Sequence, residues 1–337
     1  MTTLVNRQWT VAARPEGNVK PSDFAYREVA LSSDLKDGEI LLKTLYLGVI
    51  PVMRMYMLGW PAAGEKPLEI GDVIHGRGVA EVVASNHPDF SPGDVVQGQI
   101  GWQTYKKSTA SSSERIYKMR DHGLSYSLGV SLLGMTGFSA YFGFFDCAWP
   151  KAGDTIVISG AGGGVGSVVV QLARLTGCTV IAIAGGPAKC TYVRDLGAHH
   201  TIDYKSEDVD ARLAALCPNG LDIYFDNVGG DILATALEHL AMDARVVLCG
   251  SISEYLANET KPLPNYTRLR RVNGIMKGFF VYNYENRYRE AEDAFVKWVK
   301  AGDLKVTEDV TDRFEHMPSL LGRLYEGGNR GMSVCRI

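Results

Sequence analysis

The chain has 337 residues, of which 46% are hydrophobic and 22% are charged, a composition that excludes an intrinsically disordered protein. Lys and Arg number 35 against 38 Asp and Glu, so the net charge of −3 provides no general attraction for nucleic acid or an anionic membrane. At roughly 100–200 residues per domain, the length predicts about two domains.

The six cysteines are scattered without a Cys-x-x-Cys pair, which argues against a disulfide framework and fits a reducing compartment. The opening sequence MTTLVNRQWTVAARPEG lacks the apolar core of a signal peptide, and no apolar stretch approaches the ~20 residues of a membrane span. We therefore expect a cytoplasmic protein whose partner is a small molecule, with no nucleic acid and no membrane.

Short alternating segments with turn residues between them fill the first part of the chain. Examples are Glu39–Tyr46, Gly78–Ala84 and Asp94–Ile100, the last opened by Ser-Pro-Gly-Asp. Segments of this kind predict a β-rich domain of barrel or sandwich type over residues 1–124, with no long helical period. Later runs at Val306–Val310 and Gly331–Ile337 again indicate strands, so residues 304–337 are expected to complete this domain.

From about Ser125 the pattern changes to apolar runs that alternate with helical segments. Such alternation predicts an α/β fold with a doubly wound parallel sheet, a Rossmann domain over residues 125–303. The expected strands are Thr155–Ile158, Val180–Ala184, His199–Asp203, Leu221–Phe225, Arg245–Leu248 and Gly274–Tyr282. The expected helices are Val165–Leu175, Ser206–Leu216 with Ser206 as its N-cap, Asp231–Leu240, and Arg287–Ala301 with Ala291, Phe295, Trp298 and Val299 on one face.

A glycine-rich turn joins the first of these strands to the first helix. Gly160, Gly163 and Gly166 recur at three-residue spacing in the sequence SGAGGGVGS. Glycines let a pyrophosphate approach the backbone, and the helix N-terminus adds unpaired N–H groups with partial positive charge. Because strand, turn and helix follow one another, the segment predicts a dinucleotide site rather than a glycine-rich turn without a ligand.

The end of the second strand distinguishes between the two nicotinamide dinucleotides. An NAD site carries Asp or Glu about 20 residues past the glycines to hold the ribose hydroxyls. Here the strand ends in Ala-Gly-Gly-Pro-Ala at 184–188, without an acid, and Lys189 follows. A 2′-phosphate there meets a cation and no carboxylate, so the sequence favours NADPH over NADH.

The β-rich segment lacks the side chains of a catalytic zinc site. No cysteine precedes Cys147, and His75 stands alone in its segment. Hydride transfer without a metal needs an acceptor that is already polarised, such as a double bond conjugated to a carbonyl, or a quinone. We therefore expect no metal.

The chain resembles the zinc-independent medium-chain reductases over nearly its whole length, in particular the leukotriene/prostaglandin reductases, alkenal double-bond reductases and curcumin reductases. The segments that carry the resemblance are NRQW at 6–9, YLGVIPVMRMYM at 46–57, LGMTGFSAYFG at 133–143, SGAGGGVGSVVVQLA at 159–173, YFDNVGG at 224–230, CGSISEY at 249–255, GFFVY at 278–282 and GGNRG at 327–331. The resemblance implies a GroES-like substrate domain beside the Rossmann domain, and a homodimer paired through the last Rossmann strand.

The resemblance also implies roles for individual residues. Lys189 and Tyr204 match the pair that holds the 2′-phosphate, and Tyr255 matches a tyrosine proposed to orient the enone oxygen or deliver a proton. The nucleotide-contacting positions that it implies are Gly163, Gly164, Val165, Gly166, Lys189, Tyr204, Asn227, Cys249, Ser251, Ile252, Ser253, Tyr255, Phe279, Phe280, Val281 and Asn329. Its substrate side includes Val52, Arg54, Tyr56 and Met135.

Two segments depart from the family pattern. Relatives usually carry an acid and a tyrosine where this chain has Ile50 and Val52, and Met-Pro-Gly-Leu-Thr where it has Met-Thr-Gly-Phe-Ser at 135–139. Both changes fall near the expected nicotinamide or substrate side. They leave the substrate open and are compatible with a bulkier or more apolar one.

The expected reaction is NADPH-dependent reduction of the carbon–carbon double bond of α,β-unsaturated ketones or aldehydes. Hydride would reach the β-carbon, and Tyr255 would stabilise charge on the carbonyl oxygen or supply a proton. Two alternatives stay open at this point, an NADPH quinone oxidoreductase and an NADPH-binding protein without redox activity.

Overall fold

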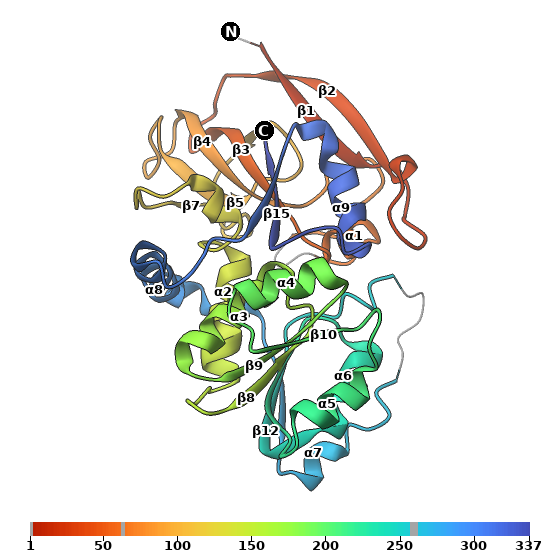
Figure 1. The fold of residues 1–337 in the computed structure, drawn as a ribbon. Helices are drawn as coiled ribbons and strands as arrows, with labels where there is room; N and C mark the ends of the chain where they lie inside the picture. The colour runs from red at the N-terminus through yellow and green to blue at the C-terminus, as the bar shows by residue number, and fades with distance from the viewer. Residues whose placement is uncertain (1–2, 62–64, 257–261) are drawn as a thin grey trace. The chain divides into compact units, whose positions relative to one another are not determined.

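The computed structural model describes residues 3–61, 65–256 and 262–337. The chain divides into two compact units (Figure 1). Unit 1 comprises Met1–Gly134, Asp309–Gly328 and Ser333–Ile337, and unit 2 comprises Met135–Glu308 and Asn329–Met332. The last residues of the chain therefore contribute to both units in turn.

Three short segments lie in a different unit from the one expected from the sequence. Residues 125–134 belong to unit 1, where the Gln97 side chain donates a hydrogen bond to the Leu133 carbonyl at 2.9 Å. Residues 304–308 belong to unit 2, where Lys305 and Gln171 exchange two hydrogen bonds. Residues 329–332 also belong to unit 2, because the Gly331 N–H is hydrogen-bonded to the Gly162 carbonyl of that unit.

Unit 1 is built mainly of β-strands, as its alternating sequence predicts. Its strands are β1 (Thr3–Val11), β2 (Phe24–Ser32), β3 (Ile40–Val49), β4 (Arg77–Ser85), β5 (Val95–Gln99), β6 (Tyr105–Ser108), β7 (Tyr117–Lys118), β14 (Glu308–Asp312) and β15 (Met332–Arg336). Its helices are α1 (Met53–Met57) and α9 (Met317–Tyr325), with 3₁₀ turns at Pro21–Asp23, Tyr126–Val130 and Phe314–His316. The helix α9 was not expected from the sequence.

Among the described residues, β1 and β2 form an antiparallel pair, and the other strands form a larger sheet in the order β14-β15-β3-β4-β5-β7, with β6 also on β3. The predicted C-terminal strand is confirmed as β15, which pairs antiparallel with β3 so that Ser333 lies opposite Val49. The last strand of the sequence is thereby paired with β3, a strand from the N-terminal part of unit 1.

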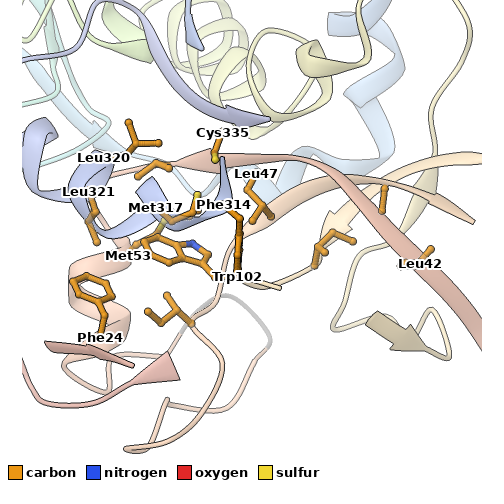
Figure 2. Close-up of a cluster of buried hydrophobic side chains, with 14 of the residues drawn as sticks. Phe24, Leu42, Leu47, Met53, Trp102, Phe314, Met317, Leu320, Leu321 and Cys335 are labelled. Atoms are coloured by element: carbon orange, nitrogen blue, oxygen red, sulfur yellow. The ribbon is translucent and has the colours of Figure 1, made fainter. Parts of the chain in front are cut away.

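The core of unit 1 surrounds the fully buried indole of Trp102, which stacks on Phe24 with 5.9 Å between ring centroids. Figure 2 shows Phe314 and Met317, from the C-terminal part of the chain, beside Trp102 and Met53. This is the packing that makes α9 a helix. Its buried residues Met317, Leu320, Leu321 and Leu324 recur at three- and four-residue spacing and face the core.

Unit 2 alternates strands and helices. Its strands are β8 (Thr155–Ile158), β9 (Thr179–Ala184), β10 (His200–Asp203), β11 (Leu221–Asp226), β12 (Leu240–Leu248) and β13 (Ile275–Gly278). Its helices are α2 (Met135–Phe142), α3 (Gly164–Thr176), α4 (Pro187–Asp195), α5 (Val209–Leu216), α6 (Gly230–Glu238), α7 (Arg268–Arg271) and α8 (Tyr288–Ala301), with a π-helical turn at Gly143–Cys147 and a 3₁₀ segment at Val281–Arg287.

The described strands of unit 2 form one parallel sheet in the order β10-β9-β8-β11-β12-β13. This is the doubly wound Rossmann order, so the predicted fold class is confirmed. Figure 1 shows α5 and α6 on one side of the sheet and α2 and α3 on the other. Leu213 of α5 and Leu237 of α6 pack with Val157 and Ile181 of the sheet in a dry core.

Three predicted boundaries in unit 2 are wrong. The N-cap of α5 is Asp208, whose carboxylate accepts hydrogen bonds from the N–H groups of Asp210 and Ala211, whereas the Ser206 hydroxyl donates to Asp203. The strand expected to reach Tyr282 ends at Gly278, because a 3₁₀ segment begins at Val281. Helix α6 ends at Glu238, and Leu240 already begins β12. None of the described helices is long and apolar enough to cross a bilayer.

Gly76→Ala is expected to destabilise unit 1, because the new Cβ would lie 2.8 Å from Cδ1 of the Trp102 indole. Overpacking costs about 1–3 kcal/mol, which should lower the midpoint of urea unfolding. Gly322→Ala is the matched control in the same unit. Its Cβ meets Val19 at 3.6 Å, and alanine favours helix α9 by up to about 1 kcal/mol. Equal midpoints for the two variants would contradict this packing.

Candidate dinucleotide-binding site

The strands β8 and β11 are neighbours at the centre of the sheet of unit 2, and the chain leaves them toward opposite faces. A crevice for a ligand forms at the carboxyl ends of strands at such a switch point. Here the residues that follow the two strands are Ser159 and Asn227. The Ser159 hydroxyl accepts a hydrogen bond from the Asn227 N–H at 2.9 Å, and the Asn227 amide donates to the Ser159 carbonyl at 2.8 Å.

The carboxylate of Asp226, at the end of β11, organises this junction. It is 1% exposed and accepts hydrogen bonds from the hydroxyls of Ser159 (2.8 Å) and Tyr224 (3.1 Å) and from the N–H groups of Val228 and Gly229 (3.1 Å). Burial raises the pKa of Asp226, and the donors act to lower it, Gly229 most strongly. The carboxylate thus fixes both loops that leave the centre of the sheet.

The glycine turn of residues 160–166 leads from β8 into α3. Gly160 has φ +57°, and a Cβ on Gly166 would lie 2.7 Å from the Ala161 Cα, so both positions need glycine. No side chain in the described part of the chain caps α3 at Gly163. The N–H groups of its first turn are therefore available to an anion, as the sequence predicts for a pyrophosphate.

The C-terminal segment 329–332 is fastened to this turn. The Gly331 N–H donates to the Gly162 carbonyl at 2.9 Å, and Gly163 and Gly331 form a parallel β-bridge. The buried Asn329 donates its side-chain amide to the Gly331 carbonyl at 2.9 Å. This explains why residues 329–332 belong to unit 2, and it places Asn329 close to the turn.

The end of β9 lies beside two side chains predicted to bind a 2′-phosphate. The ring of Tyr204 covers Gly185, where a Cβ would lie 2.8 Å from Cε1, and the stem of Lys189 covers Gly162, with Cδ at 3.1 Å. Asp203 holds this turn by accepting from the Gly186 N–H at 2.7 Å. Hydrogen bonds, chiefly that from Gly186, lower the pKa of Asp203.

The loop 249–255 follows β12 and is hydrogen-bonded to the loop after β11. The N–H groups of Cys249 and Gly250 donate to the Asp226 carbonyl, and that of Ser253 donates to the Val228 carbonyl. The predicted residues Asn227, Cys249, Ser251, Ile252 and Ser253 are thereby brought together.

Two titratable side chains in loop 249–255 are held in their neutral forms. Burial raises the pKa of Cys249 to about 12, so at neutral pH this group is a thiol and not a nucleophilic thiolate. Burial likewise raises the pKa of Tyr255, although hydrogen bonds with Ser251 act to lower it. The Tyr255 phenol is therefore protonated at neutral pH.

The predicted residues Phe279, Phe280 and Val281 follow the edge strand β13. The Phe279 ring packs on Gly143, where a Cβ would lie 2.8 Å from Cζ, whereas Phe280 is exposed. Met135, predicted on the substrate side, accepts a hydrogen bond at its sulfur from the Tyr282 hydroxyl at 3.2 Å. The sequence analysis did not single out Tyr282.

The other predicted substrate residues, Val52, Arg54 and Tyr56, lie in unit 1 at and within helix α1. Arg54 is 2% exposed and donates to the carbonyls of Gly17 (2.7 Å) and Pro15 (3.2 Å), and its burial lowers its pKa. Tyr56 packs edge-on against His75. A substrate role for these three residues stays a prediction, and Arg54 positions the loop of residues 15–17.

His75, which has no cysteine or second histidine near it in the sequence, is held by two neighbours in the structure. Its Nδ1 lies 2.6 Å from a carboxylate oxygen of Glu65, and its Nε2 lies 3.0 Å from the Lys66 carbonyl oxygen. In the described chain, no group of three or more His, Cys, Asp or Glu side chains is arranged to hold a metal ion. The described side chains therefore do not fit a zinc site.

Sequence reasoning missed residues that support the site without being predicted to contact the ligand. They are Ser159, Asp203, Asp226 and Gly185, together with Gly331 from the C-terminal segment. Asp226 and Gly331 lie within segments that carry the family resemblance, but a motif does not say which of its members bonds the backbone of another loop. The signal for Asp226 was a carboxylate at the end of an apolar strand.

The fold and the glycine turn define a dinucleotide-binding oxidoreductase class. Residues 7–116 match a family model described as the N-terminal domain of oxidoreductase, and residues 164–297 match one described as zinc-binding dehydrogenase. The second description names zinc, but the described residues contain no group of three or more His, Cys, Asp or Glu side chains that could bind it.

Individual proteins match the chain over almost its full length. It is 37% identical to the NADPH-dependent curcumin reductase of Escherichia coli, over 98% of this chain and 97% of that protein. It is 33% identical to the NADP(+)-dependent 2-alkenal reductase of Nicotiana tabacum, over 98% and 97%. The structure of CurA from Vibrio vulnificus in complex with NADPH is similar with a TM-score of 0.89 and 36% identity, covering 98% of each chain.

The chain belongs to the zinc-independent medium-chain dehydrogenase/reductases, the family of the curcumin, prostaglandin and 2-alkenal reductases. The resemblance predicted from the sequence motifs is confirmed.

Ser159→Ala is expected to destabilise unit 2 by about 1–3 kcal/mol, because it leaves the half-buried Asn227 N–H without its acceptor and removes a donor to the buried Asp226. Urea unfolding measures the loss, and faster hydrogen exchange at the Asn227 amide locates it. Ser253→Ala is the control, since its exposed hydroxyl donates to the Val228 carbonyl and should contribute less than about 0.5 kcal/mol. The same stability in both variants would argue against the network.

Proposed function

We propose that this protein reduces the carbon–carbon double bond of α,β-unsaturated ketones or aldehydes, with NADPH as its cofactor. The observation that carries the proposal is the pair Lys189 and Tyr204 beside the glycine turn and the end of β9, where no acid follows the strand. The glycines leave room that a Cβ would fill, so the residues present fit a dinucleotide with a 2′-phosphate. The NADPH-dependent curcumin reductase and the 2-alkenal reductase among the relatives support it.

NADPH, held by Lys189 and Tyr204 at its 2′-phosphate, would supply the hydride that the β-carbon of the conjugated substrate accepts. Negative charge then collects on the carbonyl oxygen, where a hydrogen-bond donor lowers the barrier. Tyr255 is assigned this role, because burial keeps its phenol protonated. A proton from Tyr255 or from water then reaches the α-carbon and completes the reduction without a metal.

Each unit has its own task in this proposal. Unit 2 binds NADPH through the sixteen positions named from the sequence, and unit 1 is the substrate domain, with Val52 and Tyr56 at its substrate side. The acid and tyrosine of relatives are replaced by Ile50 and Val52, which removes polar contacts and suits an apolar substrate. The compartment we propose is the cytoplasm, where NADPH and reduced cysteines are maintained.

Tyr255→Phe should lower kcat at least tenfold, about 1.4 kcal/mol of barrier, because the ring is retained while the hydroxyl is lost. The affinity for NADPH should change little. Steady-state kinetics with a saturating enone measure kcat, and a fluorescence titration measures NADPH binding. A change in kcat below twofold would reduce Tyr255 to a residue that lines the site.

The reaction itself is tested by following NADPH absorbance with a panel of enals, enones, steroidal enones and quinones. We expect turnover of enals and enones, and a product saturated at the former double bond by mass spectrometry. Faster turnover of quinones would identify a quinone oxidoreductase instead. Tight NADPH binding without oxidation by any acceptor would identify a binding protein without redox activity.

We also propose a homodimer that pairs through β13, the edge strand of the described sheet of unit 2. An edge strand presents unpaired N–H and C=O groups, and Ile275 on β13 is 49% exposed. Light scattering should give twice the chain mass of 36.8 kDa. Ile275→Asp should shift the protein toward the single-chain mass, whereas Val5→Asp, at an exposed position of unit 1, should not. A wild-type protein of single-chain mass would contradict the dimer.

A further inference from the structure

Arg330 lies in the short segment that is fastened to the glycine turn. Its neighbour Asn329 is buried and bonded to the Gly331 carbonyl, and the Gly331 N–H is bonded to the Gly162 carbonyl. The backbone of Arg330 is therefore held on both sides, next to the turn. Its side chain is exposed, and in the described chain it forms no ion pair with a carboxylate.

Lys189 approaches the same point of the turn from α4. Its stem lies on Gly162, the residue to which the segment of Arg330 is bonded. Tyr192 follows Lys189 by three residues and so shares its face of α4. Burial raises the pKa of Tyr192, while the hydroxyls of Ser167 and Thr307 and the charge of Arg330 act to lower it. Arg330 and Lys189 thus both adjoin Gly162, Arg330 through the backbone of its segment and Lys189 through its side-chain stem.

We propose that Arg330 is a second ligand of the 2′-phosphate of NADPH, opposite Lys189 across Gly162. The inference rests on the proposed function and adds a residue that neither the family resemblance nor the sequence pattern assigned. An arginine fork can hold two phosphate oxygens at once, whereas a lysine acts as a single point charge. Together the two cations offset a dianionic group that has no other cation from β9.

The 2′-phosphate is favoured over the pyrophosphate because the two phosphates meet different parts of the site. The first turn of α3 offers the pyrophosphate uncapped N–H groups. Arg330, in contrast, lies in the segment that is bonded through Gly331 to the Gly162 carbonyl, and the Lys189 stem lies on the same Gly162. The loss of Arg330 should therefore affect NADPH and leave NADH, which lacks this phosphate, unaffected.

The test is a titration of the full-length protein with NADPH and with NADH, followed by nicotinamide fluorescence. Arg330→Ala should raise the Kd for NADPH about tenfold, or 1.4 kcal/mol, and change that for NADH less than twofold. Arg330→Lys should recover part of the loss. Arg271→Ala, which removes an exposed arginine just before β13 and thus at the opposite edge of the sheet, should change neither Kd.

Lys189→Ala is the reference that separates this inference from the proposed function. If wild type prefers NADPH and Lys189→Ala removes that preference, the cofactor assignment holds. Unchanged NADPH binding by Arg330→Ala would then overturn the role of Arg330 alone. Equal weakening of NADPH and NADH would also overturn it, because it would place Arg330 on the pyrophosphate. A wild type that binds the two dinucleotides equally would overturn both assignments.

Discussion

The buried carboxylate of Asp226 connects the ends of the two central strands of unit 2 to the loops that follow them. A buried charge of this kind is stable only when several donors surround it, and here two hydroxyls and two backbone N–H groups do so. The donors come from the residue after β8, from β11 and from the loop after β11, while the carbonyl of the same residue accepts from two N–H groups of the loop after β12. Three segments are thereby fixed around one side chain.

The glycine turn depends on this frame, and its own shape depends on residues distant in sequence. Gly160 and Gly166 allow the backbone to fold closely on itself, and Gly331 adds a strand-like contact from the C-terminus. Lys189 and Tyr204 lie on two other glycines, Gly162 and Gly185, so both side chains are placed by the absence of a Cβ beneath them. The glycines of this site therefore make room for the Lys189 and Tyr204 side chains as well as for the turn of the backbone.

The sequence predicted the parallel sheet well, because each strand carries its own apolar run and each run is bounded by turn residues. It failed where a tertiary contact decides. Ser206 and Asp208 are both suitable N-caps. The Ser206 hydroxyl donates its hydrogen bond to the buried Asp203, so Asp208 caps the helix. Arg54 matched a substrate motif, which stays a prediction, but no local pattern indicated its hydrogen bonds to the carbonyls of Pro15 and Gly17. Asp226 lay in a recognised motif, but its partner Ser159 is 67 residues away in sequence, a separation that no local pattern encodes.

The C-terminus has a consequence for how this protein is made. Residues 329–332 belong to unit 2, and the five residues after them belong to the sheet of unit 1. While these residues are still in the ribosomal exit tunnel, unit 1 lacks β15 and unit 2 lacks the segment that is hydrogen-bonded to its glycine turn. Domains that fold during synthesis usually finish one after the other. In this chain the same short stretch completes both units, so neither unit can finish folding before residues 329–337 have been synthesised.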